Sequence, residues 1–275
     1  MQTLKPDSPM SFKIVLALSC ASILFFSCTR NAVTGKSAMT LIPESDLIVM
    51  SESEYVKFLN EHPPLPASDP NVILVRSCGE KIQKAVESYY AQKNASNQIK
   101  DFNWEFNVVN EDVVNAWCMP GGKVVVYTGL LPVTETEEGL AIVMGHEIAH
   151  AVARHGNQRM SQGMMIQFGG AVLSTAVSQK PEETQYLFNQ AYGITTGLGA
   201  LSYSRKHETE ADKMGLIFAA MAGYNPEAAI EFWQRMAKSG GQSPPQFLST
   251  HPSSETRIRD LQAFMPEAKK YYKPY

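Results

Sequence analysis

His146-Glu147-Ile148-Ala149-His150 is a short motif inside an apolar run that extends from Gly139 to Ala153. Because this run is apolar on all sides, it predicts a buried helix. Residues four apart share one face of a helix, so both imidazoles can reach a single cation. Zinc suits this pair, since imidazole is one of its preferred ligands and a catalytic zinc site keeps a fourth position for water.

Glu147 has a separate task. Next to the first histidine, its carboxylate can hold the water, accept its proton and pass that proton to a leaving amine. The alternative is a helix with incidental histidines, which we disfavour because polar groups without partners are costly in a buried helix. The motif therefore predicts one catalytic Zn²⁺ per chain.

A third metal ligand is expected downstream, in the charged segment from Ser204 to Asp212. Glu208 and Asp212 are four residues apart, so a helix places both carboxylates on one face. Glu208 can then bind the metal, while Asp212 accepts a hydrogen bond from a metal-binding imidazole and fixes its orientation. Taken alone, such a charged segment is more often a solvated helix face.

These segments resemble a known family of zinc metallopeptidases, related to CAAX prenyl proteases, the membrane protease HtpX, the mitochondrial Oma-type protease and the periplasmic BepA-type proteases. The similarity rests first on residues 145–155 and on residues 204–212. It extends over almost all of the chain after the N-terminal leader, through Asn31 to Lys36, Asn115-Ala116, Pro120-Gly121-Gly122, Tyr127 to Leu131, Thr250-His251-Pro252 and Arg257-Ile258.

The resemblance implies a zincin-like α+β fold that is mainly α, with the motif helix, a small antiparallel sheet and surrounding helices. It implies that His146, His150 and Glu208 bind zinc. It also implies that Glu147 is the general base and that Asp212 lies behind the ligands. In BepA-type members the histidine of the His-Pro signature can fill the fourth zinc position. His251 is therefore either a ligand that inhibits the resting enzyme or a surface histidine.

The N-terminus has the pattern of a secretory signal. An apolar stretch from Ile14 to Phe26 follows Lys13 and is too short to span a bilayer. We expect residues 1–27 to be a lipoprotein signal peptide that is cleaved before a lipidated Cys28. Cys20 is a rival lipidation site.

Other interpretations of the N-terminus are a simple cleaved signal and an uncleaved anchor. Met10 is an alternative start to Met1. Thr29, after the lipidated cysteine, is not an acidic retention signal and favours the outer membrane of a two-membrane host.

Residues 28–42 are expected to form the lipidated cysteine and a tether, and residues 43–275 a single metallopeptidase domain. The net charge of -3, with 24 basic and 27 acidic residues, offers no basic cluster for nucleic acid. If Cys20 is removed and Cys28 is lipidated, Cys78 and Cys118 are the cysteines that remain. They can pair in an oxidising envelope, although a buried free thiol is the commoner state.

Residues 44–59 and 70–91 predict helices, the second of them long and amphipathic. Residues 104–109 alternate and residues 123–128 are β-branched between glycines, which is typical of strands. We expect a small antiparallel sheet beside the zinc helix. An edge strand of this sheet can bind the substrate through its backbone, and the resemblance assigns to it Asn115, Ala116, Gly121 and Gly122. A core strand without a substrate role is the alternative.

Residues 158–200 lie between the metal segments and contain apolar pieces typical of helices, with a fresh helix start at Pro181. We interpret this region as packed helix; a lid or a Met-rich contact surface is the alternative. Residues 226–236 predict another amphipathic helix, followed by a loop rich in glycine and proline that leads to His251.

The leading hypothesis is a lipid-anchored zinc endopeptidase that faces the periplasm of a bacterial cell envelope and cleaves misfolded or unassembled envelope proteins. Its partners would be polypeptide substrates, the membrane and envelope assembly machinery. The rival is an envelope chaperone with structural zinc, which would not need Glu147. A zinc amidase or esterase is a weaker third hypothesis, because it predicts a closed pocket rather than a groove lined by a strand.

Overall fold

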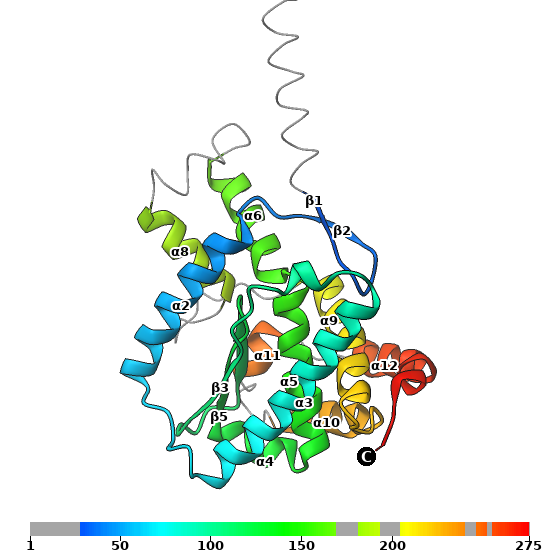
Figure 1. Ribbon diagram of the computed structural model, residues 1–275. Coiled ribbons are helices and arrows are strands. Elements are labelled where there is room, and N and C mark those ends of the chain that lie inside the picture. The colour runs from blue at the N-terminus through cyan, green and yellow to red at the C-terminus, as the bar shows by residue number, and fades with distance from the viewer. Residues whose placement is uncertain (1–27, 169–180, 193–203, 240–245, 252–254, 275) are drawn as a thin grey trace, which may run out of the picture.

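A computed structural model describes residues 28–168, 181–192, 204–239, 246–251 and 255–274. The expected signal peptide, the apolar piece at residues 171–173 and the loop at residues 240–245 lie outside the described residues. None of the helices in the described ranges combines the length and the apolar character needed to cross a bilayer. Helices surround a small sheet, with helix α5 (Glu137–Val152) between the sheet and helix α9 (Arg205–Met221) (Figure 1).

The two N-terminal helices are confirmed. Helix α2 spans Glu44–Glu61 and helix α3 spans Pro70–Gln92. The start of α3 follows from its sequence: the Asp69 side chain accepts a hydrogen bond from the Asn71 amide at 2.8 Å, and Pro70 occupies the first turn. The apolar face of α3 packs against α5 and β3.

The sheet contains β3 (Glu105–Val109), β4 (Ala116–Met119) and β5 (Lys123–Tyr127), in the order β3-β5-β4. It is mixed, so the expectation of an antiparallel sheet is only partly right. Strand β4 forms the hairpin with β5, and β3 pairs with the other side of β5 in parallel. The composition of the strands did not indicate the direction in which β3 pairs with β5.

The turn between β4 and β5 explains two glycines. Gly121 and Gly122 have φ angles of 82° and 84°, a backbone region that favours glycine. They therefore lie in the hairpin turn rather than in the strand, and a Cβ on Gly122 would lie 2.7 Å from the Trp104 ring.

Helices α5 and α9 make the closest packing of the fold. Thr136 caps α5 by accepting from the Gly139 amide at 3.1 Å, and Ser204 caps α9. Gly145 and Gly215 let the two backbones touch, because a Cβ on Gly215 would lie 2.8 Å from the His146 nitrogen. This contact brings the motif histidines opposite the carboxylates of α9.

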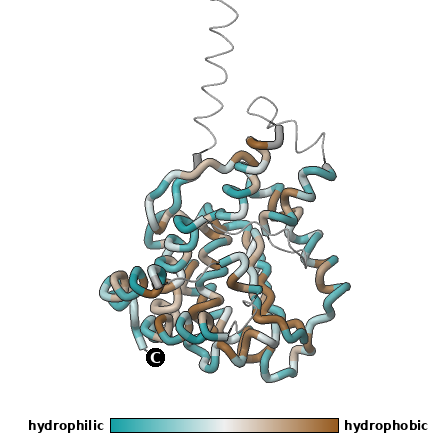
Figure 2. The backbone as a smooth tube through the Cα atoms, turned by 180° about the vertical axis from the view of Figure 1, so that it is seen from behind, coloured by the Kyte–Doolittle hydropathy of each residue, from teal (hydrophilic) through white to brown (hydrophobic). Residues whose placement is uncertain are grey.

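Further helices of the described ranges are α4 (Leu131–Thr134), α6 (His155–Phe168), α8 (Pro181–Tyr192), α10 (Ala228–Lys238), α11 (Gln246–Thr250) and α12 (Glu255–Ala268). They lie around α5 and α9 or, in the case of α8, pack against α6. Helices α8 and α10 confirm the predicted starts near Pro181 and Pro226. In the tube of Figure 2, hydrophobic segments run through the interior strands and helices.

The segment expected to be a tether contains a short hairpin. Strands β1 (Cys28–Arg30) and β2 (Ser37–Met39) pair in antiparallel fashion. Asn31 stabilises the loop between them, since its side-chain oxygen accepts from the amides of Val33 and Thr34 at 2.8 and 3.1 Å.

Candidate metal centre

Four buried side chains from three parts of the chain converge at one point. His146 and His150 come from α5, Glu208 from the first turn of α9, and His251 directly follows α11. Each offers one donor atom, and these atoms all lie within 4.8 Å of one another. The structure thus brings together the two motif histidines, the predicted third ligand and the candidate fourth ligand.

The separations of these donors fit a tetrahedral zinc ion. Nε2 of His146 lies 3.0 Å from Nε2 of His150 and 3.2 Å from Nδ1 of His251. Oε1 of Glu208 lies 3.4 Å from Nε2 of His150 and 3.0 Å from Nδ1 of His251. A tetrahedral site with bonds of about 2.0–2.1 Å separates its ligand atoms by about 3.3 Å. The spacing and the nitrogen and oxygen chemistry of the donors therefore fit one Zn²⁺.

Asp212 lies where it was expected, behind the donor group. Its Oδ1 is 3.0 Å from Nδ1 of His146, so it can accept the ring proton and leave Nε2 for a metal. This contact follows from the spacing of four residues between Asp212 and Glu208 on one helix face.

The sequence identified Arg257 only as part of the C-terminal similarity to the family and indicated no role for it. Its guanidinium donates to Asp212 at 2.6 Å and lies 2.9 Å from Oε2 of Glu208. It also lies over the Trp233 ring, with Cζ 3.4 Å from the ring centroid. Arg257 therefore links the two carboxylates of α9 and offsets their charge in a buried site.

The surroundings of the donor side chains hold them in the protonation states that bind a cation. Burial holds the pKa of His146 and of His150 well below the usual range, so both imidazoles are neutral. Burial alone would raise the pKa of Glu208, but the neighbouring histidines outweigh it and lower that pKa. Neutral imidazoles and an ionised carboxylate are the forms that bind zinc.

Glu147 is buried and differs from the other carboxylates. Burial raises its pKa to about 7, against the opposing effect of His251. Its Oε1 accepts no hydrogen bond from the described residues, and Nε2 of His251 lies 3.5 Å away. A buried carboxylate with an oxygen that accepts no hydrogen bond, beside a metal-binding group, is suited to accept a proton from bound water.

His251 is not a surface residue. It is buried, and its ring stacks on Phe247 with the centroids 4.5 Å apart. One ring nitrogen belongs to the donor group and the other faces Glu147. The sequence could not decide between these alternatives because the position of the loop depends on tertiary packing.

The predicted substrate strand is only partly assembled as expected. Ala116 begins β4, the edge strand that packs against α5, and Asn115 directly precedes it. Gly121 and Gly122 lie in the turn. Strand β4 also contains Cys118, whose pKa burial raises well above its usual value with a further contribution from Glu147, so this strand lies near the proposed base.

Cys78 and Cys118 are both buried free thiols in the structure. Strand β1 begins at Cys28, the expected lipidation site.

Known metallopeptidases are similar to this chain. A sequence model described as "Peptidase family M48" matches residues 79–265. The chain is 33% identical over 223 residues to the mitochondrial metalloendopeptidase OMA1 of Schizosaccharomyces pombe, across 80% of this chain and 61% of that protein. It is 30% identical to the human mitochondrial metalloendopeptidase OMA1, across 94% of this chain and 51% of that protein.

A third relative comes from a bacterium. The chain is 29% identical over 162 residues to the beta-barrel assembly-enhancing protease of Escherichia coli, across 57% of this chain and 33% of that protein. The chain thus spans less than two thirds of the length of each of these relatives.

Proposed function

Since the chain belongs to peptidase family M48, we propose that it is a zinc-dependent endopeptidase. The observation that carries the proposal is the position of Glu147, a buried carboxylate that accepts no hydrogen bond on Oε1 from the described residues and adjoins the zinc-type donor group. A structural zinc site needs no such carboxylate.

His146, His150 and Glu208 hold the metal, and Asp212 orients His146. Bound zinc supplies a Lewis acid that polarises the scissile carbonyl and lowers the pKa of water. Glu147 removes a proton from the attacking water and then delivers it to the leaving amine nitrogen, so that one peptide bond and one water become a carboxylate product and an amine product. Its pKa of about 7 suits both the acceptance and the donation of a proton near neutral pH.

The substrate binds as an added strand. Strand β4 is at an edge of the sheet and packs against the helix that carries Glu147. An extended polypeptide that pairs with this edge uses backbone hydrogen bonds, which do not depend on side-chain identity. Asn115 and Ala116 are the residues of this edge that we assign to substrate binding. Gly121 and Gly122 shape the turn that ends the strand.

His251 inhibits the resting enzyme by filling the fourth metal position. Its Nδ1 lies 3.2 Å from Nε2 of His146, so with His251 in place the water position is taken. Replacing His251 by Ala should raise the rate of hydrolysis. An unchanged or lower rate at equal zinc content would count against this role.

The cellular setting is part of the proposal. Residues 1–27 act as a lipoprotein signal, Cys28 is lipidated with residues 28–42 at the membrane, and residues 43–275 form the catalytic domain. The bacterial relative named for β-barrel assembly supports an envelope location at the outer membrane, with misfolded or unassembled envelope proteins as substrates and assembly machinery as a partner. Other relatives have mitochondrial names, which differ from this setting, so the element that these relatives share is the role of a protease.

The test is degradation of an unfolded protein such as casein by the full chain in detergent, beside Glu147→Gln, with the zinc content of both measured. If both proteins contain the same amount of zinc and only the unmodified chain cleaves casein, the proposal is supported. If both contain the same amount of zinc and both cleave casein at the same rate, the role of Glu147 is refuted.

One observation favours a second candidate. With His251 included, the donor group has four members, which is the closed arrangement of structural zinc sites. An envelope chaperone with structural zinc would bind unfolded proteins without cleaving them, and neither the unmodified chain nor His251→Ala would hydrolyse casein.

A further inference from the structure

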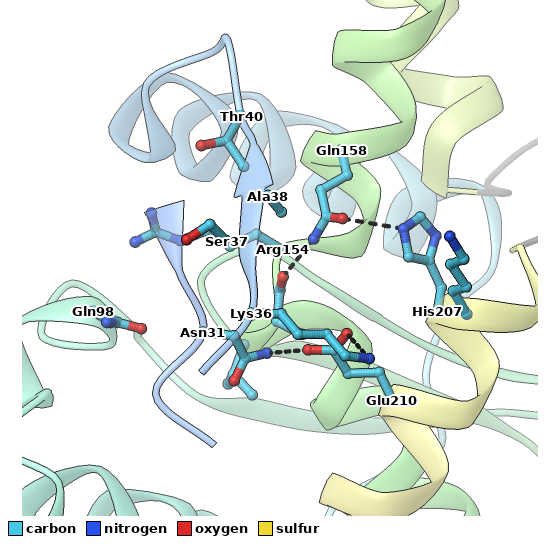
Figure 3. Close-up of a pocket in the computed structure, with 13 residues that line it drawn as sticks. Asn31, Lys36, Ser37, Ala38, Thr40, Gln98, Arg154, Gln158, His207 and Glu210 are labelled. Atoms are coloured by element: carbon cyan, nitrogen blue, oxygen red, sulfur yellow. Dashed lines mark hydrogen bonds and ion pairs between the residues drawn. The ribbon is translucent and has the colours of Figure 1, made fainter. Parts of the chain in front are cut away.

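The loop of the N-terminal hairpin contacts helix α9 at Glu210. Asn31 is buried and its Nδ2 donates to Oε1 of Glu210 at 2.8 Å. Thr34 Oγ1 donates to the same oxygen at 2.5 Å, and Lys36 Nζ lies 3.4 Å from the other oxygen. Figure 3 shows Asn31 and Lys36 directed at Glu210 on one side of a cavity of about 430 Å³, which separates part of the hairpin from α6 and α9.

Glu210 has a second contact on its inner side. His155 is buried, and its Nε2 lies 3.9 Å from Oε2 of Glu210, within electrostatic reach. The Glu210 carboxylate thus lies between the hairpin loop on one side and the imidazole of His155 on the other.

His155 in turn lies behind a proposed zinc ligand. Its Nδ1 is 3.0 Å from Nδ1 of His150, whose Nε2 belongs to the donor group. When Nε2 of His150 binds zinc, Nδ1 carries the proton and donates it to Nδ1 of His155. His155 must then carry its own proton on Nε2, the nitrogen that faces Glu210.

We propose that His155 and Glu210 are positioning residues for the zinc ligand His150, and that the loop from Asn31 to Lys36 fixes them by its contacts with Glu210. The inference rests on the proposed zinc peptidase function. Residues far apart in the chain thus connect the segment next to Cys28 with the metal centre. Asp212 supports His146 by one direct contact, whereas His150 depends on two residues and on the N-terminal hairpin.

The competing explanation is that His155 only fills space. It stacks on His207, with the ring centroids 4.5 Å apart and the rings inclined by 19°. A role in packing alone predicts that substitutions change the melting temperature of the protein and leave zinc affinity unchanged. Positioning predicts a change in zinc affinity, because partners behind a ligand typically contribute 10–100-fold to metal binding.

Five variants separate these explanations. Asn31→Asp keeps the oxygen that accepts from Val33 and Thr34, but replaces the donor to Glu210 by a carboxylate oxygen. His155→Asn keeps an acceptor near the position of Nδ1, whereas His155→Leu has similar bulk and no acceptor. Glu210→Gln removes the charge, and Glu267→Gln is its control, since the Glu267 side chain is 44% exposed and pairs with Lys270 at the surface.

The measurements are the dissociation constant of zinc by chelator competition, the visible absorption of the Co²⁺-substituted chain, and the melting temperature of the chelator-treated chain. We expect Glu210→Gln, Asn31→Asp and His155→Leu to bind zinc about 10–100-fold more weakly and to alter the Co²⁺ spectrum. His155→Asn should recover part of the affinity lost in His155→Leu, and Glu267→Gln should match the unmodified chain.

These measurements test the positioning role separately from the peptidase function. Unchanged zinc affinity and Co²⁺ spectrum in all folded variants would overturn the positioning role while leaving the peptidase proposal intact. Failure of the unmodified chain to bind zinc or to cleave casein would instead overturn the proposed function. Unchanged zinc affinity in both His155→Asn and His155→Leu, together with a lowered melting temperature, would assign His155 to packing.

Discussion

The close contact between Gly145 and Gly215 allows us to predict how much a substitution at Gly215 weakens zinc binding. A Cβ on Gly215 would lie 2.8 Å from the His146 nitrogen and 2.9 Å from the Gly145 carbonyl carbon. Ordinary contact begins at 3.4 Å, so Gly215→Ala must move α5 and α9 apart by about 0.6 Å. The contacted atoms are backbone, and no side chain can turn away to relieve the clash.

This shift matters because the two helices carry different ligands. His146 and His150 move with α5, whereas Glu208 moves with α9. Metal–ligand distances are held to within about 0.2 Å, so a separation of about 0.6 Å exceeds what the site tolerates. We expect Gly215→Ala to lower the free energy of unfolding by about 1–3 kcal/mol and to weaken zinc binding by about tenfold or more.

The assays are urea unfolding of the chelator-treated chain and zinc competition with a chromogenic chelator. Gly163→Ala is the matched control, because a Cβ there meets only the flexible end of Leu187 at 3.1 Å. Gly163→Ala should leave the free energy of unfolding unchanged or raise it by about 0.4–1 kcal/mol. Its zinc affinity should equal that of the unmodified chain. Equal zinc affinity in Gly215→Ala and Gly163→Ala would refute the reasoning that the glycine contact sets the ligand geometry.

Three further predictions concern the charged groups of the site. Asp212→Asn should weaken zinc binding by about 10–100-fold, measured by chelator competition, because it removes the carboxylate behind His146; unchanged affinity would count against that support. Arg257→Met should destabilise the chelator-treated chain by about 3–5 kcal/mol in urea unfolding, since it leaves Glu208 and Asp212 buried without their cation; a loss below about 1 kcal/mol would contradict this. Glu147 has a pKa raised from 4.5 to about 7, so its contribution to stability is present below pH 4.5 and is lost as pH rises through 7. Glu147→Gln should therefore stabilise the chelator-treated chain at pH 8 by about 3 kcal/mol more than at pH 4, and equal effects at both pH values would exclude the raised pKa.

The helical part of the site could be predicted because it depends on local spacing. The intervals from His146 to His150 and from Glu208 to Asp212 each place two side chains on one helix face, whatever the rest of the fold does. The apolar run around the motif also predicted burial correctly, since a helix that is apolar all round must be covered.

The pairing of β3 with β5 could not be predicted in the same way. Each strand has a recognisable composition, but the order of strands depends on which edges are free. Ala116–Met119 takes the hairpin position beside β5 and leaves the parallel edge to β3. The family resemblance indicated a strand at Asn115-Ala116, but it did not indicate which neighbour that strand pairs with.

Apart from Asp212, the groups behind the zinc ligands were also missed, for a related reason. Arg257 reaches Asp212 across 45 positions of the chain, and Asn31 reaches Glu210 across 179. No periodicity connects such residues. The available signal was the concentration of His155, His207 and Glu210 around the metal segments, where charged and imidazole groups without partners would be costly once buried.

The most direct test of the peptidase account is the rate of casein hydrolysis in a His251→Ala background, with and without Glu147→Gln, at equal zinc content. This background removes the side chain proposed to fill the fourth metal position, so inhibition cannot conceal activity. The account predicts that His251→Ala cleaves faster than the unmodified chain, and that adding Glu147→Gln lowers the rate by about 10²–10⁴-fold. Equal rates with and without Glu147 at equal zinc content would contradict the role of Glu147 as the base that activates water.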